Sequence, residues 1–287
     1  MIRALCAKAI DDAKWLFAAL LVLMFFFPWV FLWVSGKISL PAFSNFLTSA
    51  FPREWQQVWG VPFSQVATPA GRAALAFVHP LIVFSAAIWT VARGSDCVSG
   101  EIGRGTMEML LAQPVRRTTV YATQAIVTIA GSALLAIAVW CGTALGLHAG
   151  QLYESVHASL YLPPAINLFA LMVCLGGMTA LISSFDSVRW RTIGLMAGWY
   201  VFSTVLAVVS QIADRWNWLG NVSFLSAYKP QSMVARPDEA WSLLAHRDGA
   251  VAGLGLGGQV VVLFALGMAC YVAGAVVFSR REIPAPL

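Results

Sequence analysis

Six long apolar stretches, none of which contains a formally charged side chain, alternate with more polar stretches along this 287-residue chain. Each apolar stretch is 19 to 30 residues long. A helix rises about 1.5 Å per residue, so each stretch can cross the hydrocarbon core of a bilayer, which is about 30 Å thick. The pattern therefore predicts an all-α membrane protein with six transmembrane helices, at residues 16–34, 73–92, 118–147, 161–184, 193–212 and 255–278.

Positive charge is distributed unevenly between the loops, and this predicts the orientation of the helices. An even number of spans places both termini on one side of the membrane. The segments 1–15, 93–117, 185–192 and 279–287 carry 11 Lys and Arg side chains in 57 residues, whereas the segments on the other side carry 7 in 93. Because positively charged loops stay inside, both termini and residues 93–117 are predicted to be cytoplasmic. The net charge of +5 follows from this bias and requires no nucleic-acid partner.

Residues 1–15, ahead of the first apolar stretch, place apolar side chains at helical spacing with charged side chains mostly on the other faces. This pattern predicts an amphipathic helix that lies in the cytoplasmic membrane interface. A signal peptide is the less favoured alternative, because the following stretch contains Pro28 and Trp29 and lacks a cleavage site of small residues.

The second apolar stretch contains a histidine next to a proline, His79 and Pro80. Pro80 has no amide hydrogen and crowds the carbonyl group one turn earlier, so a kink is predicted here. Ionisable side chains inside a membrane are often functional, which makes His79 a candidate intramembrane polar site. The alternative is a histidine that is hydrogen-bonded between helices and has only a structural role.

Glycines recur in the third and fourth apolar stretches, which a short outer loop joins. The two spans are therefore predicted to form an antiparallel hairpin. Gly142, Gly146, Gly176 and Gly177 are small enough to allow the backbones of neighbouring helices to approach closely.

Residues 101–117 form a short charged segment between two apolar stretches, and they have a helical pattern of their own. Met107, Leu110 and Leu111 fall at the spacing that brings apolar side chains onto one face of a helix, whereas Glu108 lies off that face. This face is predicted to bury itself against another surface.

The ends of this short helix are marked by its flanking residues. Thr106 is a candidate N-cap, Glu108 lies in the first turn, where the helix dipole favours an acid, and Pro114 ends the helix. A helix of about two turns is not stable alone in water, so it needs a surface on which to lie. Physical reasoning leaves two readings open: an interfacial connector with snorkelling arginines, or a docking element for a partner.

The residues in and before this segment resemble the signature of a known family. An acidic residue precedes Gly-Thr-hydrophobic-Glu-x-Leu-Leu, which a proline and a basic residue follow. The matching residues are Asp96, Glu101, Gly105, Thr106, Glu108, Leu110, Leu111, Pro114, Arg116 and Arg117, with His79, Pro80 and Leu81 in the preceding stretch. This arrangement resembles type-2 ABC (ATP-binding cassette) exporter permeases, and most of all the branch linked to multicopper-enzyme maturation.

The resemblance implies a single transmembrane permease domain over residues 1–287, in a bacterial plasma (inner) membrane. It implies that residues 101–117 contain the coupling helix, which docks into a cytoplasmic ABC ATPase subunit that binds ATP and Mg²⁺. A second permease copy, identical or similar, is also implied, and a periplasmic partner is compatible with the family. The residues expected to couple to the ATPase are Glu101, Arg104, Gly105, Thr106, Met107, Glu108, Leu110, Leu111, Pro114 and Arg116.

Enzyme motifs are missing from the sequence. A phosphate-binding loop needs Gly-x-x-x-x-Gly-Lys followed by Ser or Thr, and none of the four lysines stands in that context. The chain is therefore expected not to be an enzyme and to bind no cofactor of its own. No Asp or Glu lies in the six apolar stretches, which argues against a cation-coupled carrier and favours an energy source outside the chain.

A metal site is not expected either, because the five cysteines lack the spacing of metal ligands. A transient copper or zinc contact at His148, Glu154 and His157 in one outer loop is the less favoured alternative. Two other functional classes also stay open. The chain would then be a non-transporting membrane scaffold or assembly factor, or an integral-membrane enzyme.

Overall fold

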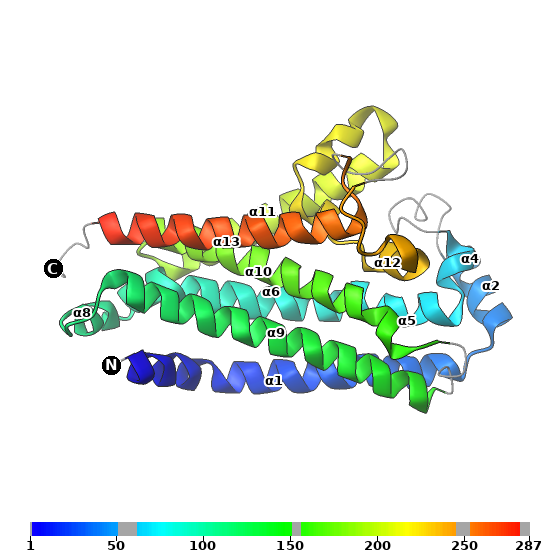
Figure 1. The fold of residues 1–287 in the computed structure, drawn as a ribbon, viewed down its shortest axis with the longest axis horizontal. Coiled ribbons are helices and arrows are strands. Elements are labelled where there is room, and N and C mark those ends of the chain that lie inside the picture. Colours follow the sequence, from blue (N-terminus) through cyan, green and yellow to red (C-terminus); the bar gives the residue numbers. More distant parts are fainter. Residues whose placement is uncertain (1, 51–61, 151–155, 245–252, 282–287) are drawn as a thin grey trace.

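The computed structural model describes residues 2–50, 62–150, 156–244 and 253–281. Six helical spans in this part of the chain are long and apolar enough to cross a membrane, which confirms the all-α prediction. They lie roughly parallel in one bundle (Figure 1). The spans are α1 (Ile2–Gly36), α5 (Pro69–Val78) with α6 (Pro80–Ser95), α9 (Arg117–Ala149), α10 (Leu162–Phe185), α11 (Arg189–Ile212) and α13 (Leu256–Arg280).

The two ends of the bundle carry different short elements. The start of α1 and the end of α13 lie at the same end as α8, which is called the α8 end below (Figure 1). The elements between α6 and α9 at this end are η1 (Asp96–Gly100), α7 (Glu101–Gly103) and α8 (Thr106–Leu111). The opposite end carries α2 (Leu40–Ala50), α4 (Phe63–Val66), η2 (Ala158–Tyr161), η3 (Asp214–Asn221), η4 (Phe224–Ala227), α12 (Pro230–Ala235) and η5 (Pro237–Glu239).

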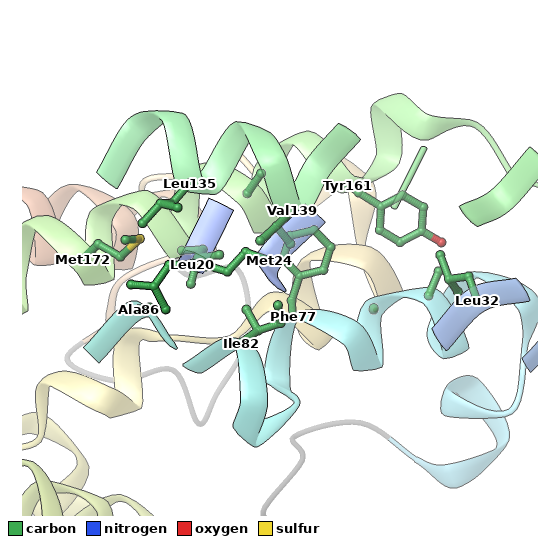
Figure 2. Packing of buried hydrophobic residues seen from close by; sticks show 14 of the residues in the cluster. Leu20, Met24, Leu32, Phe77, Ile82, Ala86, Leu135, Val139, Tyr161 and Met172 are labelled. Carbon is green, nitrogen blue, oxygen red and sulfur yellow. The ribbon is translucent and has the colours of Figure 1, made fainter. Parts of the chain in front are cut away.

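Helix α10 is the centre of the bundle. Of its most apolar stretch, 72% of the residues are buried, against 22% in each of α1, α11 and α13. The largest buried cluster joins Leu20 and Met24 of α1 to Leu135 and Val139 of α9 and Met172 of α10 (Figure 2). The outer helices α1, α11 and α13 therefore keep broad apolar faces on the outside of the bundle, as helices surrounded by lipid do.

Glycines allow the closest helix contacts, as the sequence predicts. A Cβ atom added to Gly177 would lie 2.2 Å from the carbonyl oxygen of Gly267, so α10 and α13 touch through their backbones. A Cβ atom on Gly142 would lie 2.1 Å from the carbonyl oxygen of Phe25 on α1. These glycines therefore bring α13 and α1 against the hairpin of α9 and α10, rather than bringing the two hairpin helices together.

The N-terminal segment differs from its prediction as a separate interfacial helix. Residues 2–15 continue without a break into the first span as part of α1. Ala9 and Ala13 are buried, with exposed fractions of 1% and 4%. Part of the apolar face of this segment, at Ala9 and Ala13, therefore packs against the protein, whereas Ile10 is 56% exposed.

The second span is interrupted at the predicted site, but by a break rather than a kink. Helix α5 ends at Val78, His79 has extended backbone angles, and α6 begins at Pro80. The Nδ1 atom of His79 accepts a hydrogen bond from the amide of Leu81 at 3.2 Å and so caps α6. The proline stands at the first helical position, where it needs no amide hydrogen.

Candidate coupling site

Helix α8 is six residues long. With Thr106 as its N-cap, as predicted, it would begin at Met107, but in the structure it begins at Thr106. The N-cap position belongs to Gly105, whose φ of 71° lies in the left-handed region that glycine adopts without strain. Thr106 is the first helical residue. Its hydroxyl turns back and donates to the carboxylate of Glu101 instead of capping the helix.

The apolar face of α8 points into the protein. Met107 is 1% exposed and belongs to a buried cluster with Val98, Tyr121 and Phe278. Leu111 is partly buried against the same cluster. The sequence correctly predicted an apolar face that needs a surface, but the surface is supplied by the chain's own helices. Met107 is therefore not available as an anchor for a partner.

The opposite face of α8 is exposed. Gly105, Glu108, Met109 and Ala112 stand at helical spacing, and all four are exposed. Met109 is 65% exposed, although it is as apolar as Met107. This set of four residues is called the exposed face of α8 below. Leu110, which was expected to be a second anchor, is half-buried at the edge between the two faces.

Glu101 holds the start of this segment through a group of charged partners. Its side chain is fully buried, and its carboxylate accepts hydrogen bonds from Lys8 at 2.7 Å and from Arg104 at 3.1 Å. The hydroxyl of Thr106 donates to the other carboxylate oxygen. A buried carboxylate is stable only when it has such partners. Glu101 therefore fixes α1, α7 and the start of α8 relative to one another.

Asp96 is the centre of a second group of charges, which sequence reasoning did not find. Its carboxylate lies 2.8 Å from Arg104, 3.3 Å from Arg189 at the start of α11 and 3.9 Å from Arg93. Arg93 is only 2% exposed and donates to the side-chain oxygen of Gln124 on α9 at 2.5 Å. The sequence marked Asp96 only as part of the family signature and did not show that Arg93, Arg104 and Arg189 meet it.

The turn that joins α6 to α7 is a π-helical turn, η1, and α10 stabilises it. The hydroxyl of Ser183 accepts hydrogen bonds from the amides of Val98 and Ser99, at 3.2 Å and 2.9 Å. The hydroxyl of Ser99 lies 3.0 Å from that of Thr192 on α11. Widened turns of this kind occur frequently at functional sites. Residues 101–117, called the coupling segment below, thus follow a turn that is continuous with α6 and bonded to α10 and α11.

A second loop at the α8 end, between α10 and α11, is held by Asp186. Its carboxylate accepts hydrogen bonds from Arg191 at 2.6, 3.0 and 3.2 Å, and further ones from the amides of Ser187 and Val188. The Arg191 side chain lowers the pKa of Asp186 to about 2, although partial burial opposes this shift, and the two amides lower it further. Arg281 donates to the carbonyl oxygens of Ser184 and Asp186, so the end of α13 is attached to the same loop.

The remaining residues predicted for the site lie apart from these groups. Pro114 is exposed in the link to α9, and Arg116 is the exposed N-cap residue of that helix. His79 lies between α5 and α6 in the second span, where its ring is 4.5 Å from the ring of Phe27. The capping of α6 and the packing of His79 on aromatic rings agree with the structural alternative.

In the described part of the chain, no group of three His, Cys, Asp or Glu side chains could hold a metal ion. Glu154, which the alternative zinc or copper contact would use, lies outside the described residues. The geometry at the α8 end is that of a mechanical attachment. A short helix with one anchored and one exposed face is bonded through buried charges to several spans.

Comparison with known proteins gives one match. A family model described as ABC-2 family transporter protein matches residues 11–283. No curated protein and no solved structure shows significant similarity to the chain. The matched range includes α1 from residue 11 on, the other five spans in full and residues 101–117, so the match concerns the bundle and not one motif. This chain therefore belongs to the ABC-2 transporter family, the multi-pass membrane permeases of ABC transporters.

Proposed function

We propose that this chain is the permease subunit of an ABC exporter and that the exposed face of α8 is its contact with a cytoplasmic ABC ATPase. The observation that carries this proposal is the exposure of Met109, at 65%, on a helix whose other face is buried. A small interface concentrates its binding energy in a few apolar side chains that become desolvated. Met109 is such a side chain, and Glu108 and Arg104 beside it supply charges that orient a partner.

The attachment of α8 to the spans supports a mechanical role for this contact. A displacement of α8 by the ATPase is passed through α7 and η1 into α6, because η1 and α7 follow α6 without a gap and only Arg104 and Gly105 separate α7 from α8. Ser183 and Arg189 pass the same displacement to α10 and α11. In this proposal ATP and Mg²⁺ are bound by the ATPase, and the permease converts its motion into movement of the spans.

The complete transporter in this proposal contains two permease copies in a bacterial inner membrane, with the α8 end in the cytoplasm. The excess of Lys and Arg in the segments at this end supports the orientation. ABC ATPases work in pairs, which fits two permease subunits. The cargo either passes between the two permeases, or the motion is relayed to a periplasmic protein at the opposite end.

The test is the replacement of Met109 by aspartate in the full chain, followed by co-purification of the ATPase from membranes. We expect the variant to insert and fold as the wild type does, because position 109 is exposed, and to lose at least about tenfold in ATPase recovery, as a hot-spot residue does. The matched control is Leu243→Asp, since Leu243 is 60% exposed at the opposite end. Unchanged recovery with Met109→Asp would refute the docking face.

The runner-up function, a membrane scaffold, makes a different prediction in the same experiment. A scaffold would be recovered without any ATPase already in the wild type. It would also leave ATP hydrolysis by the membranes unchanged when the chain is removed. Recovery of an ATPase whose hydrolysis rate depends on the permease supports the exporter.

A further inference from the structure

Lys8 and Glu101 are 93 residues apart in the sequence, yet their side chains are in direct contact. The Nζ atom of Lys8 lies 2.7 Å from the carboxylate of Glu101, and 3.3 Å from that of Asp12 on its own helix. Lys8 lies on the first turns of α1, next to the buried Ala9. The pair therefore connects the N-terminal turns of the first span to the coupling segment.

The partners of Glu101 show what this connection adds. Arg104 and Thr106 belong to the coupling segment itself, so their bonds to Glu101 only stabilise its own turn. Among the side-chain partners in the described residues, Lys8 is the one that comes from a different span. Loss of Lys8 would leave a fully buried carboxylate with its local partners and without its link to α1.

A second ion pair on the same helix offers an internal comparison. Lys14 and Asp11 lie 2.6 Å apart, but their side chains are 49% and 69% exposed and both belong to α1. Exposed pairs of this kind contribute little to stability, since water and salt screen them. In the pair of Lys8 and Glu101 the lysine is 36% exposed but the carboxylate is 0% exposed, so breaking the pair leaves a buried charge that only Arg104 and Thr106 then satisfy.

We propose that Lys8 is a positioning residue that makes the first turns of α1 move together with α8. This inference rests on the proposed function, in which an ATPase displaces α8. The displacement then enters the membrane by two routes, through η1 into α6 and through Lys8 into α1. Helix α1 has 35 residues and packs along α9, so a push at its first turns is carried along the bundle as far as Pro28, the residue inside this helix that lacks an amide hydrogen.

The first experiment needs no ATPase. Hydrogen–deuterium exchange is measured on the full chain in lipid nanodiscs, for the amides of residues 102–111. We expect Lys8→Gln to speed their exchange by about tenfold through local opening, while Lys14→Gln leaves it unchanged and Lys8→Arg restores the wild-type rate. Unchanged exchange in Lys8→Gln would show that the contact does not hold the segment and would overturn the proposal.

The second experiment uses the complex of the full chain with its co-purified ATPase. In the wild type we expect ATP with vanadate to change exchange in residues 3–15 as well as in residues 102–111. In Lys8→Gln the ATPase stays bound and the change is confined to residues 102–111. An equal change at residues 3–15 in the variant would overturn the proposal.

The two experiments separate this inference from the proposed function. If the wild-type chain recovers no ATPase, the exporter fails, while the exchange result on the isolated chain still tests whether Lys8 ties α1 to the coupling segment. If the ATPase binds and residues 3–15 respond regardless of Lys8, the exporter stands and the role of Lys8 is lost. In the double variant Lys8→Gln, Glu101→Gln, the loss of Lys8 should add little to that of Glu101→Gln alone, because the contact between the two residues is already altered and the other partner of Lys8, Asp12, forms only an exposed pair.

Discussion

The two methionines of α8 provide the sharpest test of how this helix is oriented. Met107 is 1% exposed and Met109 is 65% exposed, and they are two residues apart on the same six-residue helix. Truncation of a buried methionine to alanine costs about 2–5 kcal/mol, whereas an exposed substitution stays within about 0.5 kcal/mol. Every 1.4 kcal/mol is about tenfold in an equilibrium, so Met107→Ala should raise the open fraction of α8 about 30-fold or more.

The assay is hydrogen–deuterium exchange of residues 106–111 in the chain without any ATPase, so that a partner cannot affect the result. Met107→Ala should speed exchange by at least that factor, because a two-turn helix has little stability of its own once its anchor is removed. Met109→Ala should change the rate by no more than about twofold. Equal effects of the two substitutions, or a larger effect of Met109→Ala, would refute the orientation of the helix.

Three further predictions concern the rest of the bundle and are checked by thermal unfolding of the purified chain in detergent. The pKa of Asp186 in the folded protein, about 2, lies below its ordinary value of 3.8, so the ionised carboxylate stabilises the fold fully above pH 4 and loses this effect as the pH falls toward 2. Asp186→Asn should therefore flatten the dependence of the unfolding temperature on pH in this range. Gly177→Ala should cost about 1–3 kcal/mol because it forces α10 away from α13, whereas Gly198→Ala, with no atom within 4 Å of the added Cβ, should not destabilise the protein. His79→Ala should cost about 1 kcal/mol through the lost cap, and His79→Asn, which can still cap, should cost less; equal losses would contradict the capping role.

Much of the fold could be predicted from the sequence, because the physics of a membrane span is local. A helix in lipid must be apolar over its own length, so each span corresponds to one continuous apolar stretch of the sequence. The break at His79 and Pro80 could be located for the same reason, since proline acts on its own turn. The close approaches at Gly142 and Gly177 were also predictable, but not their partners, because a glycine does not encode which helix it will meet.

The orientation of α8 could not be predicted from its periodicity. The spacing of Met107 and Leu111 shows that they share a face, but it does not show whether that face meets the chain's own helices or a partner. The answer depends on Tyr121 and Phe278, which arrive from other spans. Charge pairing was unpredictable for the same reason, since Lys8 and Glu101 meet only when α1 and α7 are packed.

The central position of α10 sets an order for building the molecule, because spans leave the ribosome in chain order. Ser183, near one end of α10, finds its partners in η1, which has already been synthesised when α10 emerges. Asn167, near the other end, is fully buried and bonds to the carbonyl oxygen of Ala227 and the amide of Lys229, which are made only after the fifth span. The fourth span can therefore bind η1 at the α8 end as soon as it emerges, whereas Asn167 near its opposite end lacks the partners that Ala227 and Lys229 supply until those residues have been made.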